Sequence, residues 1–116
     1  MISILERNLE DLIVQRLEKI EPGLRLEQRQ LGTPAGRLDL LCRDAYGNYV
    51  VIELKKTRGT DQVVGQILRY IGWLKETYPE KDARGIIIVA QKDETLLYAV
   101  RAAPNIAVRE FDVSIK

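Results

Sequence analysis

One short stretch constrains the fold more than any other. Residues 85–90, GIIIVA, form a continuous run without a single polar side chain. A run of this kind, with no polar alternation, is typical of a strand that is buried on both faces of its sheet. Such a strand requires helices above and below it. We therefore expect an α/β domain. The 116 residues of the chain suffice for one domain with one core, spanning 1–116.

Helix and strand patterns alternate along the rest of the chain. Ser3 is a suitable cap for a first helix, and Pro22–Gly23 is a suitable stop. The predicted elements are a helix over 4–20, strands over 24–31, 37–43 and 49–55, a helix over 62–77, a strand over 85–90, a helix over 93–102 and a strand over 106–113. The inward side chains expected on the second helix are Val63, Ile67, Leu68, Ile71 and Leu74. This α-β-β-β-α-β-α-β order predicts a mixed β-sheet with helices on both faces.

The hairpin formed by 37–43 and 49–55 carries charges where its strands should be most apolar. Side chains alternate along a strand, so Glu53 and Lys55 share one face while Leu54 lies on the other. A turn before Tyr49 brings Asp39 across from this end of the second arm. Two carboxylates that lie close together need a cation or a proton between them. A divalent cation held by Asp39, Glu53 and the carbonyl of Leu54 would meet that need.

This constellation suits the hydrolysis of a phosphodiester. A divalent cation would neutralise the scissile phosphate and activate a water molecule, which Lys55 would orient. The residues also permit a simpler interpretation, in which the strand face is solvated and Asp39 pairs with Lys55 across the hairpin.

The helix over 62–77 offers further candidates. Gln66 and Tyr70 lie one turn apart, and with Arg69 they could meet a phosphate at the mouth of the site. A core role for Tyr70 and a solvated surface role for Gln66 are the structural alternatives. Basic residues near the strand ends are candidate DNA contacts too, with simple solvation as their alternative. The full set of candidate nucleic-acid contacts is Arg37, Lys56, Arg58 and Arg69, with Lys56 and Arg58 placed in the loop after the strand.

Glu6 has two interpretations that the residues leave open. It is the far member of a capping box with Ser3, and it is also a third carboxylate that could reach the site through water. Glu10, one turn later, competes for the second role.

Several function classes are excluded by composition. The chain has no histidine, so it contains no Ser–His or Cys–His dyad and no HExxH zinc site. Cys42 is the only cysteine, and it is expected to be a buried small hydrophobe. A net charge of +1 argues against a strongly basic nucleic-acid coat. No apolar run approaches a membrane span and no secretory signal is present, so we expect no membrane partner and a cytoplasmic location.

Asp39 followed by Glu53-Leu54-Lys55 resembles the signature of the PD-(D/E)XK nuclease superfamily, and Gln66…Tyr70 resembles the QxxxY motif of its RecB-like branch. The likeness is closer still to the C-terminal catalytic domain of the NucS/EndoMS mismatch endonucleases. It is carried by IEPGLR, GRLDLL, YVVIELKK and DQVVGQILRYIGWLKE.

This resemblance implies a restriction-endonuclease-like fold and a catalytic set of Asp39, Glu53 and Lys55. It also implies Mg²⁺ or Mn²⁺ as the cofactor, Glu6 as an accessory acid, and Gln66 and Tyr70 as residues that support the site. The resembling enzymes carry an N-terminal domain that dimerises and grips DNA, whereas the sequence in hand begins at the first catalytic helix. Whether the chain is an independent nuclease or a fragment is left open.

We therefore expect a metal-dependent DNA endonuclease that acts on structured, single-stranded or mismatched DNA. The alternatives are a non-catalytic DNA-binding or assembly module on the same fold, or a Holliday-junction resolvase. A chain this short has little surface with which to hold a duplex. We therefore also expect a homodimer, joined through the helix face that carries Trp73.

Overall fold

A computed structural model describes the backbone of residues 4–58 and 60–111, and the side chains of 8–55 and 60–111. The predicted cap Ser3 and the end of the predicted last strand at Val113 lie outside these residues. The elements are α1 (Ile4–Gln15), α2 (Leu17–Ile20), β1 (Arg25–Thr33), β2 (Gly36–Arg43), β3 (Tyr49–Arg58), α3 (Gln62–Thr77), β4 (Ala83–Gln91), α4 (Glu94–Arg101) and β5 (Ile106–Glu110).

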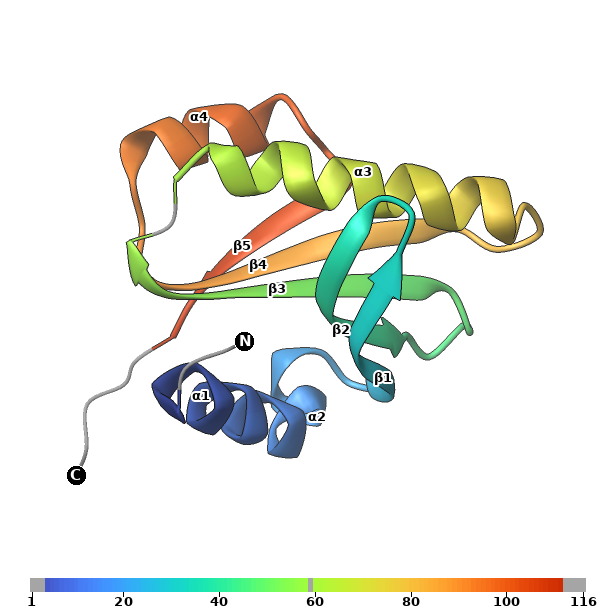
Figure 1. Ribbon diagram of the computed structural model, residues 1–116, viewed down its shortest axis with the longest axis horizontal. Coiled ribbons are helices and arrows are strands. Elements are labelled where there is room, and N and C mark those ends of the chain that lie inside the picture. The colour runs from blue at the N-terminus through green and yellow to red at the C-terminus, as the bar shows by residue number, and fades with distance from the viewer. Residues whose placement is uncertain (1–3, 59, 112–116) are drawn as a thin grey trace.

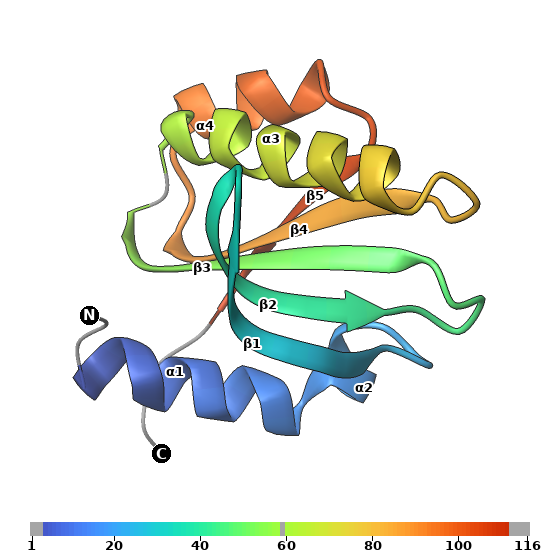
Figure 2. The same ribbon diagram turned by 45° about the vertical axis from the view of Figure 1, so that its right-hand side comes forward.

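One mixed sheet of five strands, in the order β1-β2-β3-β4-β5, forms the centre of the molecule. The β1–β2 and β2–β3 pairs are antiparallel, whereas the β3–β4 and β4–β5 pairs are parallel. Helices α3 and α4 cover one face of the sheet, and α1 and α2 cover the other (Figures 1 and 2). The predicted mixed sheet with helices on both faces is therefore confirmed.

Strand β4 confirms the interpretation of GIIIVA. Ile87 and Val89 belong to the core beneath α3, whereas Ile86 and Ile88 belong to a second core beneath α1. All four side chains are at most 3% exposed. Because this strand contributes to both cores, helices have to cover both of its faces. In the described part of the chain, none of these helices combines the length and the apolarity that crossing a bilayer requires.

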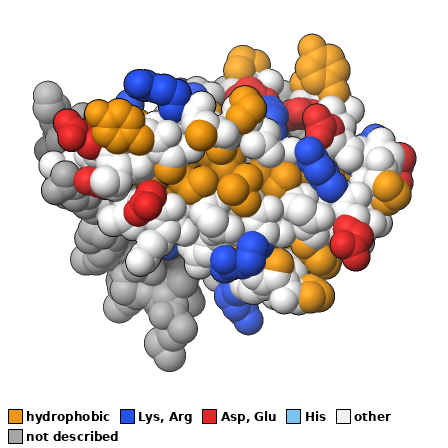
Figure 3. All heavy atoms as spheres, turned by 90° about the horizontal axis from the view of Figure 1, so that it is seen from above, with side chains coloured by type: hydrophobic (Ala, Val, Ile, Leu, Met, Phe, Trp, Pro, Cys, Tyr) orange, Lys and Arg blue, Asp and Glu red, His pale blue; other side chains and the backbone are white. Residues whose placement is uncertain are grey.

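Three local predictions were wrong. The first helix is broken at Arg16, whose φ of −122° leaves the helical region, so a separate short α2 follows. Strand β3 continues to Arg58, which pairs with Gln91 at the end of β4, so the backbone of Lys56 and Arg58 lies in a strand and not in a loop. Leu68 was expected to face inward but is 42% exposed. Hydrophobic side chains gather on the outer face over α3 and α4 (Figure 3).

The buried face of α3 explains the position of Leu68. Its members are Val63, Val64, Ile67, Tyr70, Ile71 and Leu74. This stripe keeps four of the predicted residues, and it contains Val64 and Tyr70 where the prediction had Leu68, so Tyr70 lies in the core. The helix bounds themselves, 62–77, agree with the prediction.

The hairpin of β1 and β2 separates from the sheet at its tip. The β1–β2 ladder continues to the pair Thr33–Gly36, but the β2–β3 ladder ends at the pair Leu40–Ile52. Beyond that point the hairpin rises toward α3 (Figures 1 and 2). The hydroxyl of Tyr70 on α3 donates a hydrogen bond of 2.7 Å to the carbonyl of Arg37. This bond anchors the raised tip and keeps β2 and β3 apart at this end.

Helix α3 lies very close to β4 at Gly85, and this contact gives a stability prediction. A Cβ added to Gly85 would lie 2.5 Å from Cδ1 of Ile67, which is fully buried. Gly85→Ala should therefore lower the free energy of unfolding by about 1–3 kcal/mol in urea denaturation. Gly72→Ala is the matched control, because no atom lies within 4 Å of its added Cβ. It should raise stability by about 0.5–1 kcal/mol.

A double variant checks the cause of the expected loss. Gly85→Ala combined with Ile67→Val removes the nearest atom, so part of the stability lost in the two single variants should return. Simple additivity of the two changes would contradict the steric explanation.

Candidate active site

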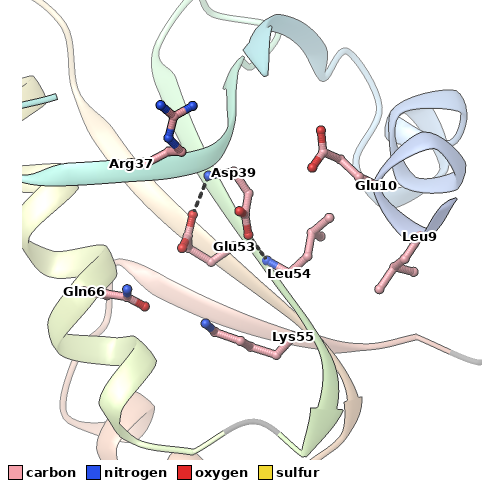
Figure 4. Close-up of a pocket in the computed structure, with 8 residues that line it drawn as sticks. All are labelled: Leu9, Glu10, Arg37, Asp39, Glu53, Leu54, Lys55 and Gln66. Atoms are coloured by element: carbon pink, nitrogen blue, oxygen red, sulfur yellow. Dashed lines mark hydrogen bonds between the residues drawn. The ribbon is translucent and has the colours of Figure 1, made fainter. Parts of the chain in front are cut away.

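Where the β2–β3 backbone ladder ends, two carboxylates accept main-chain hydrogen bonds across the two strands. The backbone N–H of Asp39 donates to Oε2 of Glu53 at 2.7 Å, and the backbone N–H of Leu54 donates to Oδ2 of Asp39 at 2.8 Å (Figure 4). Each acidic side chain thus accepts a main-chain hydrogen bond from the opposite strand. The structure brings Asp39 and Glu53 together as the hairpin pattern predicted, and the separation of the strands opens the space beside them.

Burial raises the pKa values of both acids, and a neighbouring negative charge adds to each: that of Glu10 on Asp39 and that of Asp39 on Glu53. Glu53 is only 3% exposed, and burial together with the negative charge of Asp39 raises its pKa to about 8. Burial also raises the pKa of Asp39, against the opposing effects of the Leu54 amide, the Gln30 side chain and the Lys55 charge. The pair therefore resists carrying two negative charges at neutral pH unless a cation joins it.

A pocket of about 150 Å³ lies beside the two carboxylates. Helix α1, strands β2 and β3, and helix α3 all contribute to its wall. Its lining residues are Leu9, Glu10, Arg37, Asp39, Glu53, Leu54, Lys55 and Gln66 (Figure 4). Within the described side chains, no hydrogen bond or ion pair holds the ammonium of Lys55. Its stem extends toward Gln66, which leaves the ammonium available for a ligand (Figure 4).

A second cavity of about 400 Å³ adjoins the first, because Lys55 and Gln66 line both. Its other lining residues are Thr60, Gln62, Val63 and Arg69. Two cationic side chains and several amide or hydroxyl groups thus surround this space. The hollow next to the acidic pair is consequently basic and polar, which suits a negatively charged chain such as a nucleic-acid backbone.

The remaining predicted residues occupy different places. Gln66 and Arg37 line the first pocket and Arg69 lines the second, whereas Tyr70 is buried and reaches the site only through the carbonyl of Arg37. Three predicted side chains lie outside the described residues: Glu6, Lys56 and Arg58.

Glu10, considered from the sequence only as a rival to Glu6, lines the pocket and is 3% exposed. Its carboxylate accepts hydrogen bonds from Nε of Arg29 at 2.7 Å and from Nε2 of Gln30 at 2.9 Å. Sequence reasoning missed Arg29 and Gln30. The available signal was Gln30 itself, a polar residue at a position where the alternation of β1 calls for an inward apolar one.

The donor atoms suit a hard divalent cation. Asp39 and Glu53 offer carboxylate oxygens, Leu54 offers a carbonyl oxygen, and the chain contains no histidine to compete. Oxygen ligands of this kind are those that Mg²⁺ and Mn²⁺ prefer. Among the described residues, no three acidic side chains converge as a ready-made cation cage. The fit therefore depends on the two carboxylates and the repulsion that a cation would relieve.

Comparison with known proteins finds one family whose members resemble this chain along most of its length. The family profile of the endonuclease NucS C-terminal domain matches residues 5–113. Endonuclease NucS of Sulfolobus acidocaldarius is 36% identical over 92 residues, which cover 79% of this chain and 36% of that relative. This chain thus spans only about a third of that relative's length.

Two solved structures share the fold along nearly the whole chain. EndoMS in a complex with double-stranded DNA superposes with a TM-score of 0.84 and 29% identity, covering 96% of this chain and 46% of that one. A repair endonuclease from Pyrococcus abyssi superposes with a TM-score of 0.85 and 26% identity, covering 98% and 50%.

The raised pKa of Glu53 gives a pH prediction for the metal-free protein. The unfolded carboxyl ionises near pH 4.5, whereas the folded one ionises near pH 8. Stability should therefore fall as the pH rises between these values, by on the order of a few kcal/mol. Glu53→Gln keeps an acceptor for the Asp39 amide but carries no charge. It should match the parent near pH 5 and exceed it above pH 8 in urea denaturation with EDTA.

Glu76→Gln is the matched control, because Glu76 is exposed on α3. It should leave the pH dependence of the parent unchanged. A Glu53→Gln variant whose stability paralleled the parent at every pH would show that Glu53 is not forced toward its neutral form.

Proposed function

Because this chain belongs to the family of endonuclease NucS C-terminal domains, we propose that it is the catalytic unit of a divalent-metal-dependent DNA endonuclease. The observation that carries the proposal is the pair of half-buried Asp39 and buried Glu53, which lies where β2 and β3 separate. Lys55 lines the same pocket, and its ammonium has no hydrogen-bond or ion-pair partner among the described side chains. A protein that used this domain only as a binding module would gain nothing from two adjacent acids that are removed from solvent and close enough to repel each other.

Asp39, Glu53 and the carbonyl of Leu54 would hold Mg²⁺ or Mn²⁺ in this proposal. When bound, the cation would neutralise negative charge on the scissile phosphate and favour attack by water. Lys55 shares the pocket with both acids, so its ammonium is available to orient that water or to stabilise charge that develops on the phosphate.

Two residues of α3 would support this chemistry. Gln66 lines both cavities, so its amide can meet the substrate between them. Tyr70 keeps β2 away from β3 through its bond to the Arg37 carbonyl, so it would act on the shape of the site rather than on the substrate.

DNA is the proposed substrate. The EndoMS structure similar to this chain is a complex with double-stranded DNA. In this chain, the cavity lined by Lys55 and Arg69 adjoins the acidic pair, so a phosphate next to the scissile one would meet cationic side chains. Arg37 at the first pocket is a further proposed contact. The proposed preference is for structured, single-stranded or mismatched DNA, which a panel of labelled substrates distinguishes.

We further propose that the active form is a homodimer, because cutting both strands of a duplex requires two sites. The helical face over α3 and α4 supports this proposal. Leu68 of α3 is 42% exposed, and Leu97 and Tyr98 of α4 are 37% and 66% exposed. Hydrophobic side chains gather in the middle of the face over these two helices (Figure 3). Trp73, the residue proposed from the sequence, is half-buried and lies edge-on to Tyr78.

Metal removal tests the proposed chemistry directly. Cleavage of labelled duplex, single-stranded, mismatched, flapped and branched DNA should require Mg²⁺ or Mn²⁺ and should stop in EDTA. Asp39→Asn and Glu53→Gln should each lower the single-turnover rate by about 10²–10⁴-fold, the range expected when a charged group is lost from the chemical step. Ca²⁺ should support binding with little cleavage, because its looser coordination positions the reactants poorly.

Glu94→Gln serves as the control for these variants, because Glu94 is an exposed acid at the start of α4. It should cut at the parental rate. Full activity in EDTA, or in either pocket variant, would overturn the metal-dependent mechanism.

A second prediction separates chemistry from binding. Lys55→Ala should lower the single-turnover rate by about 10²–10⁴-fold at saturating enzyme and leave DNA affinity close to parental. Lys55→Arg should stay impaired, because a guanidinium is planar and does not readily deprotonate. Arg69→Ala should instead weaken binding to all sequences and lower the salt slope by about one counterion.

Lys75→Ala is the control, since Lys75 is exposed near the end of α3 and pairs with Asp82 at 3.6 Å. Rates and affinities should both match the parent. If Lys55→Ala cut at the parental rate once fully bound, Lys55 would be a phosphate contact only.

A further inference from the structure

Gln30 connects two acids that belong to different elements. Its Nε2 donates to Oε2 of Glu10 on α1 at 2.9 Å and to Oδ1 of Asp39 on β2 at 3.3 Å. The other oxygen of Asp39 is held by the Leu54 amide, so the whole carboxylate is fixed from two sides. One amide group thus spans the distance between the helix below the sheet and the acidic pair.

The backbone of Gln30 is unusual in a way that serves this contact. Its φ is +50°, and it is the only non-glycine residue with a positive φ in the described part of the chain. Side chains other than glycine adopt this region at a cost, and such residues are frequent at functional sites. The paired neighbours Arg29–Leu40 and Leu31–Leu38 place Gln30 opposite Asp39. The guanidinium of Arg37 donates to the Gln30 carbonyl at 3.2 Å and so holds this conformation.

Arg29 holds the other end of the connection. Its Nε donates to Oε1 of Glu10 at 2.7 Å, and its Nη2 donates to Oδ1 of Asp11 at 2.6 Å. Glu10 is therefore not free to rotate, and the amide of Gln30 is fixed between an immobile partner and Asp39. The adjacent residues Arg29 and Gln30 both reach α1, although regular alternation would send their side chains to opposite faces of β1.

We propose that Gln30 is a positioning residue, which orients the Asp39 carboxylate for a divalent cation by bracing it against Glu10 of α1. This inference rests on the proposed function. Hydrogen-bond donors behind a ligating carboxylate typically change metal affinity by about 10- to 100-fold when they are removed. Because the Gln30 amide also bonds Glu10 on α1, the position of that helix should affect the affinity of the site for its cation.

A purely structural role for Gln30 is the competing explanation. In that case the amide merely fastens α1 to the hairpin, and any effect on cation binding follows from lost stability. The positive φ separates the two explanations. Gln30→Ala and Gln30→Gly both lose the amide, but only glycine relieves the backbone strain. The two variants should therefore differ in stability and agree in cation affinity if the amide acts by positioning.

The experiment titrates the whole chain with Mn²⁺ at one fixed pH and measures the melting temperature at each Mn²⁺ concentration. The half-saturating Mn²⁺ concentration should rise by about 10- to 100-fold in both Gln30→Ala and Gln30→Gly. The melting temperature without metal should be a few degrees higher for Gln30→Gly than for Gln30→Ala. Gln28→Ala is the matched control, because Gln28 is an exposed glutamine on the same strand. It should bind Mn²⁺ like the parent.

Single-turnover DNA cleavage provides an independent reading. Its dependence on Mn²⁺ should shift to higher concentration by the same factor in both Gln30 variants. Parental half-saturation in the Gln30 variants would overturn the positioning role and leave the proposed nuclease intact. Affinities that follow the stability difference between Ala and Gly would overturn it as well. A parent chain that neither binds Mn²⁺ nor cuts DNA would overturn the proposed function, and this inference with it.

Discussion

The exchange of hydrogen bonds between Asp39 and Glu53 is the interaction on which the site depends. Sheet strands normally satisfy their amides through the backbone ladder, yet here that ladder stops at Leu40–Ile52 and two carboxylates replace it. This arrangement keeps the strands linked while they separate. It also holds buried Glu53 next to half-buried Asp39, whose negative charge disfavours ionisation of Glu53. The two hydrogen bonds that keep β2 and β3 linked therefore also hold together two acids that are stabilised by a nearby cation.

The sequence predicted the parts of this arrangement that depend on local patterns. The bounds of α3, the hairpin and the proximity of Asp39 to Glu53 follow from helical spacing, alternation and turn residues. It did not predict the break at Arg16, the exposure of Leu68 or the length of β3 to Arg58. Each of these three features depends on which other segment of the chain packs against the helix or strand concerned. The hydrogen bond from Gln30 to Glu10 joins residues 20 positions apart, and no local pattern specifies it.

The two faces of the sheet contribute different things to one pocket. From the face of α3 come Gln66 and, indirectly, Tyr70, which anchors the raised hairpin tip. From the face of α1 comes Glu10, held by Arg29 and Gln30. The pocket lies where β2 departs from β3, so that both helical layers reach the same space there. This position explains why residues from four elements meet around a pair of acids.

Because Gly85 has no side chain, α3 can pack close to β4, and this contact affects the site. Ile67 fills the place where a Cβ would be, and Gln66, the next residue back along α3, forms a wall shared by both cavities. The height of the helix above the sheet is thus set inside the core, on the side away from solvent. A larger residue at this buried position would move the helix away from the sheet and change the width of the two cavities beside the acidic pair. The size of these cavities can accordingly be changed through core volume, without altering any residue that lines them.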